Sequence, residues 1–166
     1  MKNRCRPCLL VAGIACLCLC AGCPAPADDP LEPNDSVETA TPLTAGVPVE
    51  GRAVQGNIDV FSVTSTAGRE VIFILETIDG EDCGHFTVLD EGGAVLYADG
   101  RQGCGRVSPA AVQVEGAGLA VSAEGTYRLT VPAQSGRTYY LLIRELPYAD
   151  NLVPNAWDYR LTAVTP

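Results

Sequence analysis

The chain has 166 residues, of which 47% are hydrophobic and 19% are charged, and its formal net charge at pH 7 is −9. This composition excludes an intrinsically disordered chain and predicts a single globular domain. The acidic excess argues against nucleic acid and anionic lipid as partners, because both require a basic surface.

Residues 1–22 have the pattern of an export signal. Basic residues at positions 2, 4 and 6 precede a short apolar run from Cys8 to Cys20, which is too short for a comfortable membrane span. Removing residues 1–22 takes away three basic residues and no acidic one, so the mature chain has a net charge of −12.

The segment "LCAGC" ends at Cys23 and resembles the lipobox of bacterial lipoproteins. The resemblance implies cleavage before Cys23 and attachment of lipid to that cysteine. The protein would then lie in the cell envelope, on the outer membrane or the cell surface, and contact the membrane through its lipid anchor. The alternatives are an ordinary signal peptide, which would make the protein secreted, and an uncleaved anchor.

Residues 23–30, "CPAPADDP", read as a short and stiff linker, and the folded domain is expected from Leu31 to Pro166. The domain begins with the polar segment "LEPNDSVETATPL". This segment could hold one helical turn capped by Asn34 or Ser36, but Pro42 limits its length.

From about Gly46 the sequence indicates strands. The runs "IDVFSV", "GTYRLTVPA" and "WDYRLTAV" alternate along the chain, "REVIFILETI" suits a buried strand, and "HFTVLDEGGAVLYADG" predicts a hairpin turning at Glu91-Gly92-Gly93. The segment from Val107 to Ala123 is compatible with one or two strands with a bulge, or with a loop. We therefore predict an all-β fold, an antiparallel and jelly-roll-like β-sandwich of about eight strands.

Only Cys83 and Cys104 lie outside the first 23 residues. In an exported protein this pair predicts a disulfide, which would contribute about 3 kcal/mol to stability in the chain-entropy model. The competing hypothesis is a metal site made of Cys83, His85 and Cys104, but no fourth ligand is evident.

The segments "EPNDSVETATPL" and "VEGRAVQGNIDVFSV", together with the C-terminal strands "TYYLLI" and "DYRLTAV", resemble the bacterial pre-peptidase C-terminal domain and the related collagen-binding domains of clostridial collagenases. The resemblance covers nearly all of the mature chain and implies a β-sandwich in which two acidic segments bind calcium. Carried over to this sequence, the ligands would be Glu32, Asn34, Asp35, Asn57 and Asp59. Asn57 stands where that family usually has an aspartate.

The same residues suit calcium on chemical grounds, because this ion takes about six to eight hard oxygen ligands. Asn57 and Asp59 share one face of an extended chain, so both can face a ligand provided by the first segment. The alternative is that these side chains only form turns and helix caps.

No catalytic motif is evident in the sequence. His85 is the single histidine, and no nucleophile elbow, P-loop or zinc-protease motif accompanies it.

Tyr139 and Tyr140 are adjacent in one strand, so one is expected in the core and the other outside. Tyr97, Tyr148 and Trp157 either lie near a surface or cover the core. The sequence thus predicts a monomeric, non-catalytic module that binds or stabilises at a surface, with a protein or polysaccharide as its ligand. The alternatives are a metal-free structural or assembly protein of the periplasm or surface and, more remotely, a small hydrolase.

Overall fold

The computed structural model describes residues 29–79, 84–99, 110–123, 125–145 and 156–166. These residues form one 3₁₀ turn, η1 (Val37–Thr39), and eleven strands. The strands are β1 (Thr41–Pro42), β2 (Val49–Val54), β3 (Ile58–Thr64), β4 (Glu70–Asp79), β5 (Gly84–Asp90), β6 (Val95–Ala98), β7 (Val112–Gln113), β8 (Gly118–Ala123), β9 (Thr126–Pro132), β10 (Thr138–Glu145) and β11 (Ala156–Val164).

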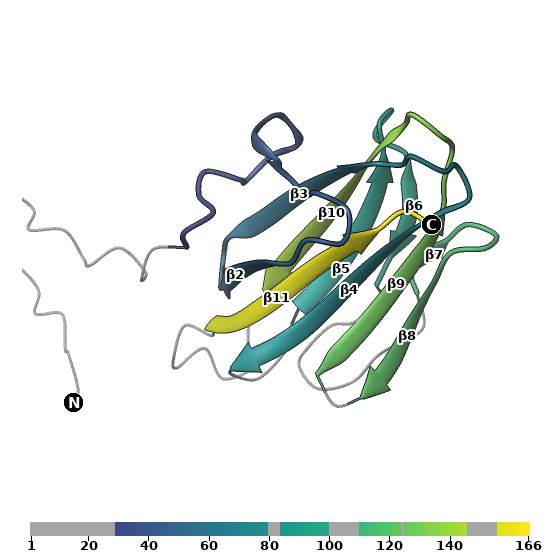
Figure 1. The fold of residues 1–166 in the computed structure, drawn as a ribbon. Helices are drawn as coiled ribbons and strands as arrows, with labels where there is room; N and C mark the ends of the chain where they lie inside the picture. The colour runs from purple at the N-terminus through teal and green to yellow at the C-terminus, as the bar shows by residue number, and fades with distance from the viewer. Residues whose placement is uncertain (1–28, 80–83, 100–109, 124, 146–155) are drawn as a thin grey trace, which may run out of the picture.

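The strands form two sheets that pack face to face, which confirms the predicted β-sandwich (Figure 1). One sheet has the order β1-β3-β10-β5-β6-β7 and the other has the order β2-β11-β4-β9-β8. The chain changes sheet repeatedly, for example between β2 and β3, between β3 and β4, and between β10 and β11, as in a jelly roll.

The alternation in the sequence places one side of each strand in the core. Along β11, Trp157, Tyr159, Leu161 and Ala163 are buried, whereas the residues between them are half-buried or exposed. Burying a large apolar side chain contributes roughly 1.5–3 kcal/mol, so this inner layer provides much of the stability of the domain.

The prediction of about eight strands was too low, and the pairing is not wholly antiparallel. β1 and β7 contain two residues each, too few to show alternation, and β1 pairs with β3 in parallel. The segment from Val107 to Ala123, for which the sequence allowed strands or a loop, contains β7 and β8. The pairing of β8 with β9 shifts register at a bulge.

The predicted helical turn exists as η1, with Ser36 as its N-cap residue. The backbone N–H of Ser36 donates to Thr39 Oγ1 at 3.1 Å, which closes the turn. Residues 29–40, here called the N-terminal arm, lead through η1 to β1, and η1 lies against β3. The arm therefore meets the sandwich at the end where β3 begins (Figure 1).

In the part of the chain described here, no helix has the length and apolar character needed to cross a membrane.

Candidate metal centre

Three carboxylates meet where the N-terminal arm contacts the start of β3. Asp29 and Glu32 come from the arm and Asp59 from β3, and one oxygen of each lies within 4.8 Å of the other two. Asp29 and Asp59 are buried, while Glu32 is exposed. The site is therefore anionic and open to solvent on the side of Glu32.

Asp59 is buried because β3 directs it inward. It lies on the same strand face as Phe61, and 1% of its surface is exposed. The Tyr159 hydroxyl donates to Asp59 Oδ2 at 2.6 Å, and the Tyr159 ring contacts Phe61 edge to face. This hydrogen bond joins β11 of one sheet to β3 of the other.

Glycine at position 51 provides the space for Tyr159. Gly51 is opposite Tyr159 in the pairing of β2 with β11. A Cβ atom at position 51 would lie 2.5 Å from the Tyr159 hydroxyl oxygen and 3.0 Å from Leu31 Cδ1. Any larger residue would push the phenol away from Asp59 and the arm away from the core.

Hydrogen bonds from backbone N–H groups shape the arm and attach it to β3. Asp29 Oδ1 accepts the N–H of Leu31 at 2.9 Å, and Glu32 Oε2 accepts the N–H of Asn34 at 3.1 Å. The carbonyl of Asn34 accepts the N–H of Val60 at 2.8 Å. The last bond connects the arm directly to the backbone of β3.

The amide of Asn57 bridges two of the carboxylates. Its Nδ2 donates to Glu32 Oε1 and, at 3.3 Å, to Asp59 Oδ1. The side chain thus holds the arm carboxylate and the strand carboxylate together. That Asn57 is itself a calcium ligand remains a prediction.

Burial and mutual repulsion oppose ionisation in this site. Burial, together with the charges of Asp29, Glu32 and Asp35, raises the pKa of Asp59 to about 7, although the hydrogen bond from Tyr159 opposes the rise. Burial also raises the pKa of Asp29, with a contribution from Glu32, while the N–H of Leu31 acts in the opposite direction. The pKa of Tyr159 is raised by burial and by the negative charge of Asp59.

The site also contains polar atoms without partners in the described structure. Both side-chain atoms of Asn34, which is fully buried, and Asp29 Oδ2 have no hydrogen-bond partner among the described residues. None of the ion pairs found in the described ranges involves Asp29, Glu32 or Asp59. Buried polar groups normally have partners, so the two oxygens among these atoms, Asn34 Oδ1 and Asp29 Oδ2, leave coordination capacity for a further group.

These features fit a calcium ion. Oxygens that share an ion at about 2.3–2.6 Å can lie no more than about 5 Å apart, and the three carboxylates satisfy this condition. All the atoms available as metal ligands are hard oxygens, the type that calcium prefers over softer ligands. A divalent cation would also offset the repulsion that raises the pKa of Asp59.

The structure brings together some of the residues proposed from the sequence and adds others. Asn57 contacts both Glu32 and Asp59, and Asn34 is buried in the arm, where its N–H donates to Glu32. Asp35 is exposed and is not part of the carboxylate group. Asp29 and Tyr159 were missed as members of the site. Asp29 lies in the segment that the sequence assigned to the linker.

Other residues singled out in the sequence lie elsewhere. Cys23, Cys83, Cys104 and Tyr148 lie outside the described residues. His85 alternates with buried Gly84 and Phe86 and therefore lies on the outer side of β5, opposite Arg144 on β10.

The aromatic residues follow the prediction that they form the core. Tyr139 is buried and Tyr140 is half-buried, as expected for neighbours on opposite faces of β10. Tyr97 and Trp157 are buried as well, so they cover the core and do not form a surface patch.

Comparison with known proteins found similar solved structures only. No family model matches the chain, and no curated protein matches it. The pre-peptidase C-terminal domain of a collagenase from Bacillus anthracis is one similar solved structure, with 15% identity, 75% of this chain and 93% of that chain covered, and a TM-score of 0.44. A periplasmic inhibitor of g-type lysozyme from Aeromonas hydrophila is another, with 10% identity, 75% and 94% covered, and a TM-score of 0.42. The family that the sequence was found to resemble is thus represented among the similar structures.

Proposed function

We propose that this chain is an exported, lipid-anchored, non-catalytic β-sandwich module that binds one calcium ion between its N-terminal arm and β3. In this role calcium holds the arm on the domain, and the domain acts as a binding or stabilising module at the cell envelope. Asp29, Glu32 and Asp59 would provide carboxylate oxygens, and Asn34 would provide an amide oxygen.

One observation carries the calcium assignment. Three carboxylates from two segments lie with oxygens within 4.8 Å of one another, and two of the three are buried. Burying like charges without a cation is unfavourable, since each ionised group loses hydration and repels the next. A bound cation is the simplest arrangement in which all three are ionised at neutral pH.

Calcium would act on the arm rather than on a substrate. The arm contains one 3₁₀ turn and leads into the two-residue strand β1, so it has little regular structure of its own. Coordination by oxygens from the arm and from β3 would connect the two, as metal clips do when they close a loop. Calcium suits this cage better than magnesium, which requires near-octahedral geometry and retains water.

The test is a calcium-dependent rise in melting temperature. We expect the rise in the wild type, its loss in Asp59→Asn, and its retention in Glu38→Gln, which removes one exposed charge from η1. An equal rise with magnesium would contradict the choice of calcium, and a rise that survives Asp59→Asn would place the effect outside this site.

The lipid anchor rests on Cys23 and its flanking sequence. Cells expressing the full chain should incorporate a fatty-acid analogue into it, and Cys23→Ala should abolish the label and release the protein from the membrane fraction. Labelling that persists in Cys23→Ala would contradict the proposed anchor. Unlabelled wild-type protein in the medium would instead support an ordinary signal peptide.

The placement of the candidate residues supports the proposed non-catalytic role. The single histidine lies on the outer side of β5, and the carboxylates of the arm site are connected to one another and to Tyr159. Their position at the junction of the arm and the sandwich suits a structural cation.

A further inference from the structure

A second site lies at the opposite end of the sandwich from the arm. Asp59 pairs with Ile143 near the end of β10, whereas a cleft of about 670 Å³ opens where β10 begins. The turn between β5 and β6 forms one side of the cleft, and the connection from β9 to β10 forms the other. Its volume lies in the range of small-ligand sites, roughly 300–1,000 Å³.

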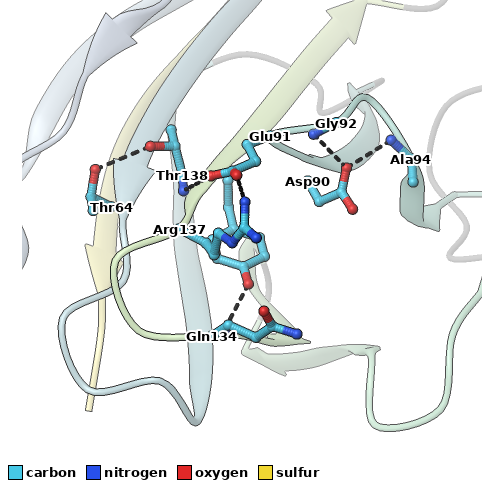
Figure 2. A network of polar contacts seen from close by, with 9 residues as sticks. Thr64, Asp90, Glu91, Gly92, Ala94, Gln134, Arg137 and Thr138 are labelled. Atoms are coloured by element: carbon cyan, nitrogen blue, oxygen red, sulfur yellow. Dashed lines mark hydrogen bonds and ion pairs between the residues drawn. The ribbon is translucent and has the colours of Figure 1, made fainter.

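Asp90 presents an oriented carboxylate oxygen to this cleft. Its Oδ1 accepts the N–H groups of Gly92 at 2.9 Å and Ala94 at 2.8 Å, so the turn itself holds the side chain (Figure 2). Asp90 Oδ2 has no hydrogen-bond partner among the described residues. This oxygen remains available as an acceptor.

Tyr139 provides the opposite function, a hydroxyl donor. The side chain is 4% exposed and lines the cleft, and its hydroxyl oxygen accepts the N–H of Gln134 at 2.7 Å. A phenol has one proton to donate. No described residue accepts that proton, although buried hydroxyls usually donate as well as accept.

Arg137 and Glu91 form an ion pair at the wall of the cleft, drawn in Figure 2. The second oxygen of Glu91 accepts the N–H of Thr138 at 3.3 Å, which ties the β5–β6 turn to β10. A guanidinium has five N–H groups, so Arg137 retains donors beyond this pair. With Asp90, the cleft contains two acidic groups and one basic group.

The combination of free donors and free acceptors selects the ligand chemistry. An ammonium group has donors only, so it would pair with Asp90 but leave the proton of the Tyr139 hydroxyl without an acceptor. A carboxylate at Arg137 would face the negative charges of Asp90 and Glu91. A hydroxyl both donates and accepts, so it pairs with either kind of group without introducing a like charge.

Gln134 adds a polar residue to the lining, and much of the rest of the cleft is apolar and suits the C–H faces of sugar rings. Leu96, Pro132 and Ala133 provide this surface beside the polar groups. We propose that the cleft binds a neutral saccharide, with hydroxyl groups that donate to Asp90 and accept from Tyr139 and Arg137. The proposal rests on the suggested role as a binding module, but it does not depend on calcium.

The test is a ¹H–¹⁵N NMR titration of the exported chain, in saturating calcium, with neutral oligosaccharides of β-1,4-glucan, α-1,4-glucan, chitin and mannan. We expect at least one of them to shift the amide signals of Gly92, Ala94 and Gln134 in a saturable way. Asp90→Asn should weaken that binding about tenfold, because the new amide retains the oxygen that accepts the turn N–H groups but loses the free carboxylate oxygen.

Two further variants keep the result interpretable. Tyr139→Phe should also weaken binding, by several-fold, while the packing of the ring is retained. Glu38→Gln removes a charge at the other end of the domain and should leave the affinity unchanged. Dispersed amide spectra would show that each variant is folded.

Three outcomes would overturn the assignment. The first is that none of the oligosaccharides shifts the amides of the cleft. The second is that binding is unchanged in both Asp90→Asn and Tyr139→Phe. The third is that a lysine-rich peptide binds in the cleft in a way that depends on Asp90, while the oligosaccharides do not. Each leaves the calcium-dependent melting temperature unaffected, so failure here and failure of the calcium site are separable.

Discussion

Calcium at about one hundred times its dissociation constant is expected to raise the melting temperature of this domain by about 10 °C at pH 7.5. A ligand that binds only the folded state at that concentration stabilises it by about 2.7 kcal/mol. For a domain of this size, each kcal/mol corresponds to roughly 4 °C. The effect should be large because the ion pairs with three carboxylates that otherwise repel one another.

The variant Asn34→Leu provides a specific test of stabilisation by calcium. In EDTA the variant should be as stable as the wild type or more stable, by up to about 2 kcal/mol, because leucine removes two buried polar atoms that have no partner in the described structure. In calcium the order should reverse, since the variant lacks one oxygen ligand. The measurement is a pair of melting curves for each protein, one in calcium and one in EDTA.

The control for this reversal of the stability order is again Glu38→Gln, which should have the stability of the wild type both in calcium and in EDTA. If Asn34→Leu lost several kcal/mol in EDTA, its amide would have a structural partner and no spare capacity for a cation. If it retained the full calcium increment, Asn34 would not be a ligand.

Without calcium, the ionisation of Asp59 alone should lower the free energy of unfolding by up to about 4 kcal/mol as the pH rises from 4 to 8. Burial first, and then the neighbouring charges, raise the pKa of Asp59 to about 7, far above its value in an unfolded chain. The folded state therefore holds a proton between about pH 4 and pH 7 that the unfolded state has released, and stability decreases with pH in that window. Each unit of pKa difference corresponds to about 1.4 kcal/mol. Asp29 contributes in the same direction, because burial raises its pKa too.

This pH dependence is measured by urea unfolding in EDTA, with Asp59→Asn as the matched variant. An asparagine still accepts the Tyr159 hydroxyl but does not ionise, so the variant should lose most of the slope and be more stable than the wild type at pH 8. Saturating calcium should reverse the trend for the wild type, since the ion binds ionised carboxylates and its contribution grows with pH. Identical slopes for the two proteins in EDTA would show that Asp59 ionises normally in the folded state.

Much of the architecture could be predicted because period-two alternation reports directly on burial in a two-layer sheet. The alternation in "WDYRLTAV" identified the buried side of β11, and the glycines after Asp90 identified the hairpin turn. The strand order could not be predicted, since the pairing of β11 with β2 joins residues about one hundred positions apart in the chain. Two-residue strands such as β1 have no period to detect.

The candidate site could be predicted only in part from the sequence, because contacts between distant segments leave no local signal. Acidic and amide residues close together in the arm and before β3 gave a local signal. The alternation along the strand predicted that Tyr159 points inward, but nothing in the local sequence indicated that its hydroxyl would contact Asp59. Gly51 was the one available clue, because a glycine within a strand suggests close approach of another group. Asp29 was assigned to the linker because it lies next to prolines and alanine, a composition that indicates a tether.

Amide hydrogen exchange of the arm, measured with and without calcium, tests the central claim most directly. The N–H groups of Leu31, Asn34 and Val60 are all bonded within the site, so a shared ion should slow their exchange at least tenfold, and Asp59→Asn should restore the fast rates. Equal rates in calcium and in EDTA, in a protein whose core amides are protected, would show that no cation joins the arm to β3.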